Sequence, residues 1–217
     1  MLNAADFHSM ARGFGMKYLM TIKRSWVLSR LAIEMIEMPT QYTKFTVETW
    51  VESAMRYFTS RNFRVIGEDG KVYGYGRSIW AMIDTESRQP TDIFSIDNGA
   101  INDWIEKEKE CPIDKGGRVK MDDQAELVRT IDTYYNDIDI NGHVNSVKYI
   151  EHVLDLWDLA WYKEHQIKRF EIAYVAEAHQ GDQLSFYRTA SGDSEYSVRI
   201  CKEGDVETCR SKVTFFD

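Results

Sequence analysis

The sequence has few cysteines, and this scarcity sets its first limits. Its 217 residues include three, Cys111, Cys201 and Cys209. Three is too few, and an odd number, for a disulfide framework. Cys201 and Cys209 would face each other across a hairpin, where a disulfide is one reading and reduced core thiols are the preferred one. A cytoplasmic, reducing location suits this chain best.

Long apolar runs and an excess of positive charge are also missing. No apolar stretch approaches the ~20 residues of a membrane-spanning helix. The first residues, MLNAADFH, lack the basic and apolar segments of a secretory signal. The net charge of −8 argues against nucleic-acid binding, which depends on neutralising phosphates.

What is present is enough apolar material for a substantial core. The chain is 43% hydrophobic and 13% aromatic, and its length suits one domain or two small ones. The predicted elements follow the same order in two halves, with strands recognised by β-branched and aromatic residues. The first half has a helix over 2–12 and strands over 25–37, 44–52, 54–66 and 72–84. The second half has a strand over 126–134, a helix over 145–165 and strands over 168–177, 183–189, 196–202 and 207–216.

A central helix followed by four antiparallel strands describes a helix wrapped by a curved sheet, the hot-dog fold. The sequence therefore predicts an α+β protein with two tandem hot-dog copies, over residues 1–90 and 123–217. Residues 91–122 are predicted to be a linker with a short helix near 102–109. The first copy is expected to lack its initial strand, and an unpaired sheet edge makes a homodimer possible.

The most informative stretch is DIDINGHVN, residues 137–145, which combines two carboxylates, two amides and an imidazole. A helix is predicted to follow, with Asn145 or Ser146 as its N-cap. The first N–H groups of a helix are positively polarised and can stabilise an oxygen that gains negative charge. A purely structural alternative is a turn at Asn141-Gly142. A turn alone would not explain Asp139, His143 or the helix that follows. The helix is expected to bury an apolar stripe of Val147, Ile150, Leu154, Trp157 and Trp161.

Residues 139–150, DINGHVNSVKYI, resemble the acyl-ACP thioesterase signature D-x-N-x-H-V-N-x-V-K-Y-I. WVLSRLAIEM at 26–35, Pro39 and FTVETW at 45–50 resemble the first-domain pattern of the same family. Glu177 stands where the family has its catalytic glutamate. The resemblance covers nearly the whole chain and implies the double hot-dog architecture. It also implies hydrolysis of the thioester between a fatty acyl chain and acyl carrier protein (ACP), with Asp139, Asn141, His143 and Glu177 as catalytic residues.

These four groups suit thioester hydrolysis, which needs an activated water or a nucleophile and a donor for the carbonyl oxygen. His143 is the first candidate for proton transfer, because imidazole titrates near neutral pH. Glu177, predicted on a strand, either activates water or attacks directly to form an anhydride. Asn141 donates to the carbonyl or holds the water. Asp139 cannot donate while ionised, so it orients Asn141 or the turn, or polarises His143.

Neighbouring residues are expected to play lesser parts. Plant members of the family often have Cys directly after the glutamate, where this chain has Ala178, so a thiolate nucleophile is disfavoured. Asp137 is not expected to be catalytic, and His152 is expected to be an ordinary histidine. His179 is close enough to Glu177 in sequence to line the mouth of the site. No metal or other cofactor is expected, because no His/Cys cluster has zinc-ligand spacing.

The expected partner, ACP, is acidic and would be repelled by the net charge of this chain. Attraction would then depend on a local basic patch. The candidates, which would otherwise be ordinary solvated side chains, are Lys148, Lys163, Lys168 and Arg169. Two other functions remain open: hydrolysis of acyl-CoA, and acyl-chain binding without catalysis, which the shortened first copy favours.

Overall fold

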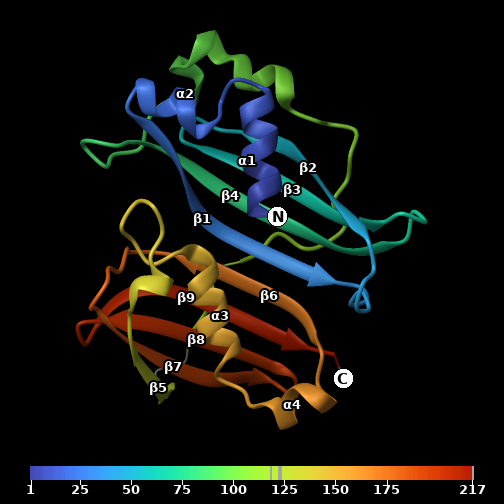
Figure 1. Ribbon diagram of the computed structural model, residues 1–217, viewed down its shortest axis with the longest axis vertical. Coiled ribbons are helices and arrows are strands. Elements are labelled where there is room, and N and C mark those ends of the chain that lie inside the picture. Colours follow the sequence, from blue (N-terminus) through green and yellow to red (C-terminus); the bar gives the residue numbers. More distant parts are fainter. Residues whose placement is uncertain (118, 122–123, 217) are drawn as a thin grey trace. The chain divides into compact units, whose positions relative to one another are not determined.

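The computed structural model describes residues 1–117, 119–121 and 124–216. It divides into two compact units, Met1–Gly116 and Gly117–Asp217. Each unit is an antiparallel sheet with a helix against one face (Figure 1). None of the helices in the described residues is long and apolar enough to cross a membrane.

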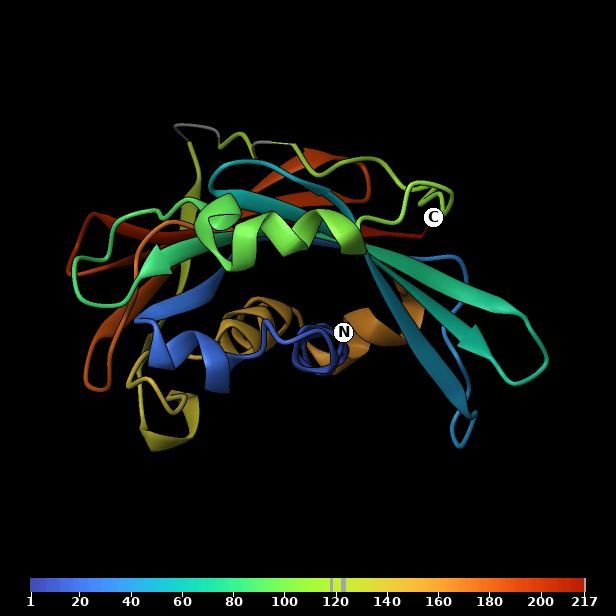
Figure 2. The same cartoon turned by 90° about the horizontal axis from the view of Figure 1, so that it is seen from above.

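The first unit begins with two short helices and continues with four strands. The helices are α1 Leu2–Ala11 and α2 Met16–Thr21, and the strands are β1 Arg24–Met35, β2 Phe45–Ala54, β3 Phe58–Gly67 and β4 Val72–Asp84. The strands lie in the order β2-β3-β4-β1 with every neighbour antiparallel. Gly70 closes the β3–β4 hairpin with a φ of +83°, as the Asp-Gly pair predicts. In the view of Figure 2, α1 (blue, near the label N) lies on one side of these strands.

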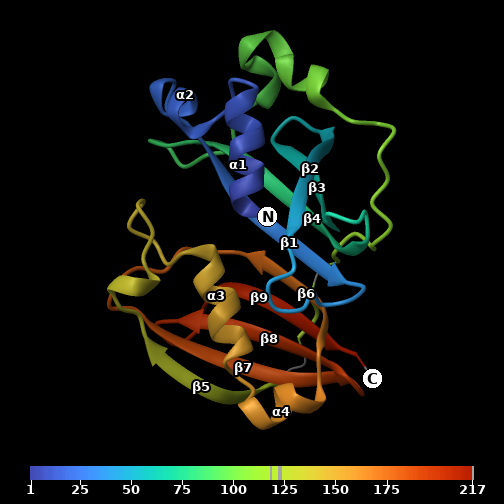
Figure 3. The ribbon, with the colours of Figure 1, turned by 45° about the vertical axis from the view of Figure 1, so that its right-hand side comes forward.

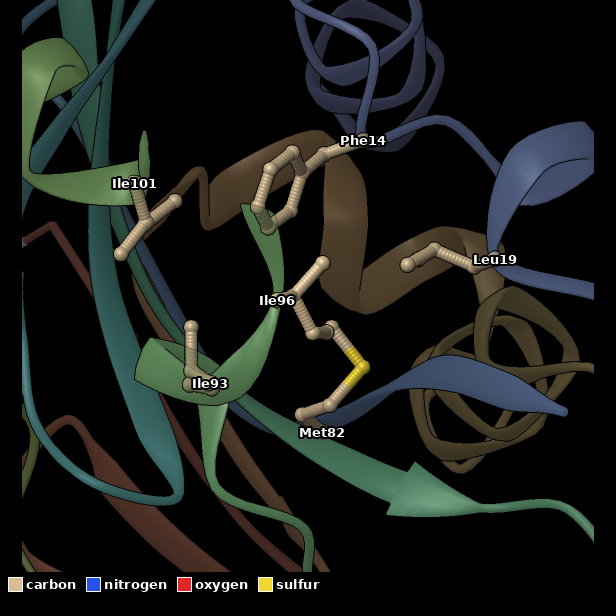
Figure 4. Close-up of a cluster of buried hydrophobic side chains, with 6 residues drawn as sticks. All are labelled: Phe14, Leu19, Met82, Ile93, Ile96 and Ile101. Carbon is tan, nitrogen blue, oxygen red and sulfur yellow. The ribbon is translucent and has the colours of Figure 1, made fainter. Parts of the chain in front are cut away.

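The segment after β4 packs into the core of the first unit. Its two 3-10 helices are η1 Ile93–Ser95, which Asp92 caps by accepting from the N–H of Phe94, and η2 Asp97–Trp104. Their buried side chains pack with those of α2, β4 and the α1–α2 connection in one cluster, formed by Phe14, Leu19, Met82, Ile93, Ile96 and Ile101 (Figure 4). Burying an aliphatic side chain of this size contributes about 1.5–3 kcal/mol. The boundaries of the two copies stay a prediction. This part of the segment predicted to be a linker belongs to the core of the first unit.

The helix predicted near 102–109 is wrong. The helical turns end at Trp104, and Ile105 forms a parallel bridge with Val51 on β2. The N–H of Glu106 then donates to the carbonyl of Val51 at 2.9 Å. These bonds hold the chain extended along the outer edge of β2, so the helix cannot continue.

The described residues of the second unit form five strands and two α-helices. In chain order its elements are β5 Glu126–Asp132, η3 Tyr135–Asp137, α3 Ser146–Leu154, α4 Leu159–Glu164, β6 Ile167–Tyr174, β7 Gln183–Gly192, β8 Glu195–Lys202 and β9 Val206–Phe215. The strands lie in the order β6-β9-β8-β7-β5, all antiparallel. Figure 3 shows α3 crossing the strands of this unit, with β5 at the edge beyond β7.

Both units therefore have a helix followed by four antiparallel strands in the same spatial order. The predicted tandem hot-dog fold of the α+β class is confirmed. β5, which precedes the helix of the second unit and pairs with β7, has no counterpart among the described residues of the first unit. That the first copy lacks its initial strand stays a prediction.

The single helix predicted over 145–165 is wrong, because the chain forms two helices. α3 ends at Leu154, and α4 starts after Asp158, whose side chain accepts from the N–H of Trp161 at 2.8 Å. An aspartate at an N-cap stabilises a new helix by about 1 kcal/mol. This cap and the buried ring of Trp157 favour the break.

The predicted apolar stripe is wrong in part, because α3 turns a different face toward the sheet from the one predicted. α3 buries Tyr149 and Val153, while Val147 is 41% exposed. Beyond the break, Trp157 and Trp161 leave the stripe and pack edge-on against Tyr196 and Phe215.

The core of the second unit follows the two-residue period of its strands. On β9 the buried side chains alternate along one face, at Cys209, Ser211, Val213 and Phe215. All three cysteines of the chain are buried and outside any disulfide, and the reduced state of these thiols stays a prediction. Burial raises the pKa of the Cys209 thiol, which keeps it protonated and unreactive at neutral pH.

Candidate active site

The residues of the DINGHVN motif form a tight loop in front of α3. Ile138 and Val144 form an antiparallel bridge, and the N–H of Asp139 donates to the carbonyl of His143 at 2.9 Å. Gly142 has a φ of +82°, a backbone conformation that favours glycine. Asn141 and Gly142 therefore lie in a turn, as the structural alternative predicted. Gly142 has the positive φ expected for such a turn, whereas Asn141 does not.

The carboxylate of Asp139 is bonded to the loop that carries it. Its Oδ1 accepts from the N–H of Asn141 at 2.8 Å and from the N–H of His143 at 3.4 Å. Its Oδ2 lies 3.5 Å from the side-chain amide of Asn141. Asp139 thus orients both Asn141 and the turn, two of the three options that the sequence left open.

His143 and Glu177 meet although they come from different loops. His143 Nε2 lies 3.3 Å from Glu177 Oε2, and the two side chains are 25% and 41% exposed. A carboxylate only accepts hydrogen bonds, so this contact favours the tautomer with a proton on Nε2. The pair is therefore partly shielded from water and still accessible to a substrate.

Main-chain bonds hold the two loops together beside this pair. The N–H of Val144 donates to the carbonyl of Ala178 at 2.8 Å, so the residues after His143 and Glu177 are joined directly. The N–H groups of Val175 and Ala176 both donate to the carbonyl of Thr208. This double contact ends the regular ladder, so β6 stops at Tyr174 and Glu177 lies in a loop. The prediction that Glu177 lies on a strand is wrong for this reason.

The start of α3 is fixed to both the loop and the sheet. Asn145 is the N-cap, and its side chain accepts from the N–H of Val147 at 2.8 Å. The hydroxyl of Tyr174, on β6, donates to the carbonyl of Ser146 at 2.8 Å. Burial raises the pKa of this hydroxyl, so it remains a neutral donor. The predicted N-cap is confirmed, and one of the helix amides proposed for charge stabilisation is already bonded to the cap.

A second imidazole lies beside His143. The rings of His143 and His179 meet edge to face, with their centres 5.1 Å apart. The N–H of His179 donates to Asp182 Oδ2 at 2.8 Å, which fixes the backbone at this point. The prediction that His179 lies at the mouth of the site agrees with this position. Within the described residues, no group of three or more His, Cys, Asp or Glu side chains is arranged to hold a metal ion.

Comparison with known proteins gives a consistent result. Models of the acyl-ACP thioesterase N-terminal and C-terminal domains match residues 1–95 and 120–215. The chain is 50% identical to an acyl-ACP thioesterase from Bacteroides thetaiotaomicron, whose crystal structure it matches with a TM-score of 0.92, over 99% of this chain and 86% of that one. This chain belongs to the acyl-ACP thioesterase family.

More distant members of the acyl-ACP thioesterase family share its fold. The structure of a 12:0-ACP thioesterase from Umbellularia californica matches with a TM-score of 0.83 at 23% identity, over 99% of this chain and 86% of that one. A palmitoyl-acyl carrier protein thioesterase from Gossypium hirsutum is 25% identical over 88% of this chain and 48% of its own length. The chain spans about half the length of the curated relatives it matches.

The family signature drew attention to four residues, and the structure places them in two adjoining loops. The structure also contains a hydrogen-bonded pair, Asp137 and His152, next to these four residues. Asp137 is buried, and its Oδ1 lies 2.8 Å from Nε2 of His152 on α3. The sequence did not predict this pair: Asp137 was not expected to be catalytic, and neither residue belongs to the four-residue signature set.

The four cationic residues predicted as an ACP-binding patch are not equivalent. Lys148 pairs with Glu151 at 2.7 Å, and Arg169 pairs with Glu171 at 2.7 Å with both side chains largely buried. Lys163 and Lys168 are exposed. Because an ion pair weakens the field of each partner, Lys163 and Lys168 are the better candidates for attracting an anionic carrier.

Proposed function

We propose that this protein hydrolyses the thioester of fatty acyl-ACP to a free fatty acid and ACP. The contact between His143 and Glu177 is the observation that best supports this, because it joins a proton-transfer group to a carboxylate beside the family signature. Membership of the acyl-ACP thioesterase family supports the same reaction. We also propose a cytoplasmic location, because three cysteines are too few and too odd in number for a disulfide framework.

The reaction requires one water molecule and two proton transfers. The first goes from water to the His143–Glu177 pair, and the second goes from the pair to the departing sulfur. The His143–Glu177 pair takes a proton from water as the water oxygen attacks the thioester carbonyl. The tetrahedral intermediate then expels the carrier thiolate, and the proton held by the pair passes to that sulfur. The products are a carboxylic acid and a free thiol, so atoms and charge balance.

The other two motif residues have supporting roles in this proposal. The Asn141 amide donates to the carbonyl oxygen as it gains negative charge, or holds the attacking water. Asp139 keeps Asn141 and the backbone of His143 in place through its three contacts. The buried, protonated state of Cys209 and the alanine at 178 both favour water over a thiolate as the nucleophile.

The first test is the release of free thiol from acyl-ACP and acyl-CoA that carry the same acyl chain, over a range of chain lengths. We expect higher kcat/KM with acyl-ACP. Comparable or faster turnover of acyl-CoA would favour the acyl-CoA thioesterase. Binding of acyl-ACP without thiol release would favour the non-catalytic acyl-chain binding protein.

The second test is the substitution His143→Ala. We expect kcat to fall by a factor on the order of 10² or more, because a proton-transfer group is lost. Circular dichroism checks that the variant is folded. Wild-type turnover in a folded variant would refute the assignment of the site.

A further inference from the structure

A buried hydrogen bond between Asp137 and His152 lies next to the proposed catalytic loop. Asp137 has a side chain that is 3% exposed, and its Oδ1 lies 2.8 Å from Nε2 of His152, which is 18% exposed. The carboxylate accepts only, so the hydrogen in this contact belongs to His152. A buried carboxylate is strongly destabilised without such a partner, so the hydrogen bond from His152 helps to keep Asp137 in place.

Asp137 makes hydrogen bonds at three separate points. Besides the contact with His152, its Oδ2 accepts from the N–H of Tyr134 at 2.8 Å. Its main-chain carbonyl accepts from the N–H of Asn145, the N-cap of α3, at 2.8 Å. One residue therefore connects the turn before the loop, the first residue after the loop, and the second turn of the helix.

The catalytic loop lies between two of these points. Asp139, Asn141 and His143 all fall between Asp137 and Asn145, so both ends of the loop are tied to Asp137. A displacement of Asp137 would move His143 relative to Glu177, whose loop is held to Thr208 by the Val175 and Ala176 bonds and joined to the catalytic loop through the Val144–Ala178 bond. Catalysis is sensitive to such displacements, and errors of about 1 Å can reduce rates by orders of magnitude.

We propose that Asp137 and His152 are positioning residues that hold the catalytic loop so that His143 stays against Glu177. The proposal rests on the proposed catalytic role of His143. Neither residue touches the substrate; both act through the loop. A merely structural alternative is that the pair only fastens α3 to the sheet, where the ring of His152 faces that of Phe186 at 6.3 Å.

The test compares His152→Leu with His152→Gln in the full-length protein, by thiol release from acyl-ACP. Glutamine places an N–H donor close to the position of histidine Nε2, whereas leucine fills the space without a donor. We expect His152→Leu to lower kcat by a factor on the order of ten or more with little change in KM. His152→Gln should restore most of the lost rate.

The same substitution in the His143→Ala background separates positioning from general structural damage. If His152 acts through His143, His152→Leu should reduce the residual rate of His143→Ala by much less than it reduces the wild-type rate. Equal losses in both backgrounds, a change in KM alone, or no rescue by glutamine would overturn the proposal.

An NMR measurement keeps the test independent of activity. The ring signals of His143 in the wild type should shift in His152→Leu and return in His152→Gln. Unchanged signals in His152→Leu would refute positioning even if His143 proves not to be catalytic, whereas wild-type activity of His143→Ala would refute only the catalytic assignment. If His152→Leu does not fold, Asp137→Asn provides the same comparison of ring signals.

Discussion

The central helices of the two units each have a histidine as their seventh residue, but the two histidines face opposite charges. In α1, Nδ1 of His8 lies 3.2 Å from a guanidinium nitrogen of Arg61 on β3. In α3, Nε2 of His152 lies 2.8 Å from the carboxylate of Asp137, in the segment before the helix. The first contact joins a helix to its own sheet, and the second joins a helix to the segment that leads into the DINGHVN loop.

This difference shows how the same scaffold supports different tasks. Arg61 is buried, and its other partners are the hydroxyls of Thr49 and Ser9. Burial and the nearby charge of Arg12 lower the pKa of Arg61 to about 10, so it remains charged at neutral pH. The first unit thus uses a helix histidine as a neutral acceptor for a buried cation. The second uses one as a donor to a buried anion, on which the proposed site depends.

The largest expected difference between the units is in the effect on kcat of replacing a glutamate. The two glutamates compared follow corresponding strands. Glu177 follows β6 and contacts His143, whereas Glu37 follows β1 and pairs with Lys71 at 2.7 Å. We expect Glu177→Gln to lower kcat by a factor on the order of 10², because the amide cannot take a proton. Glu37→Gln is the matched control and should keep wild-type kcat in the same thiol-release assay. Equal effects of the two substitutions would remove the functional distinction between the units.

A smaller effect is expected from the pH dependence of His8. Burial and the charges of Arg61 and Arg12 lower the pKa of His8 from 6.5 to about 4. Between these pH values the unfolded chain binds more protons than the folded one, so the free energy of unfolding falls as the pH falls through this window. Because His8 is only partly buried, we expect a loss on the order of 1–2 kcal/mol at pH 4 relative to pH 7.

Urea unfolding at pH 7.0, 5.5 and 4.0 measures this loss, with His8→Asn as the control. Asparagine keeps an acceptor near the position of Nδ1 but does not titrate. The variant should lose less stability than the wild type across the window. The same slope in both proteins would mean that His8 is not the group responsible.

The smallest effect is expected from blocking the cysteines, which lie buried in the cores of both units. Burial raises the pKa of Cys201 and Cys209, so little thiolate is available for alkylation. Native protein treated with iodoacetamide should keep its activity within about twofold, since no thiolate takes part in the proposed reaction. All three thiols should react after unfolding in urea. Loss of activity in step with labelling of one native thiol would contradict this.

The sequence predicts the fold well because strand periodicity and turn glycines are local signals. Runs rich in β-branched and aromatic residues locate the strands of both units, and Gly70 marks a hairpin that the structure contains. The four candidate site residues came from the family signature, and the structure brings His143 and Glu177 into contact. Their catalytic roles remain proposals.

The remaining features depend on contacts that local patterns do not contain. The helix break at Asp158 depends on a cap that competes with continuation of α3. Glu177 leaves the sheet because two amides share the carbonyl of Thr208. The Asp137–His152 pair joins residues from a turn and a helix, and only the folded chain places them together.

The hydrogen bond between Val144 and Ala178 has a practical consequence for enzyme redesign. It uses main-chain atoms, which every amino acid except proline can supply at position 144. Position 178 must stay small, because Ala178 is fully buried. Elsewhere on the two loops an engineer can exchange side chains without removing this main-chain link, which makes this unit a scaffold for altering the proposed site.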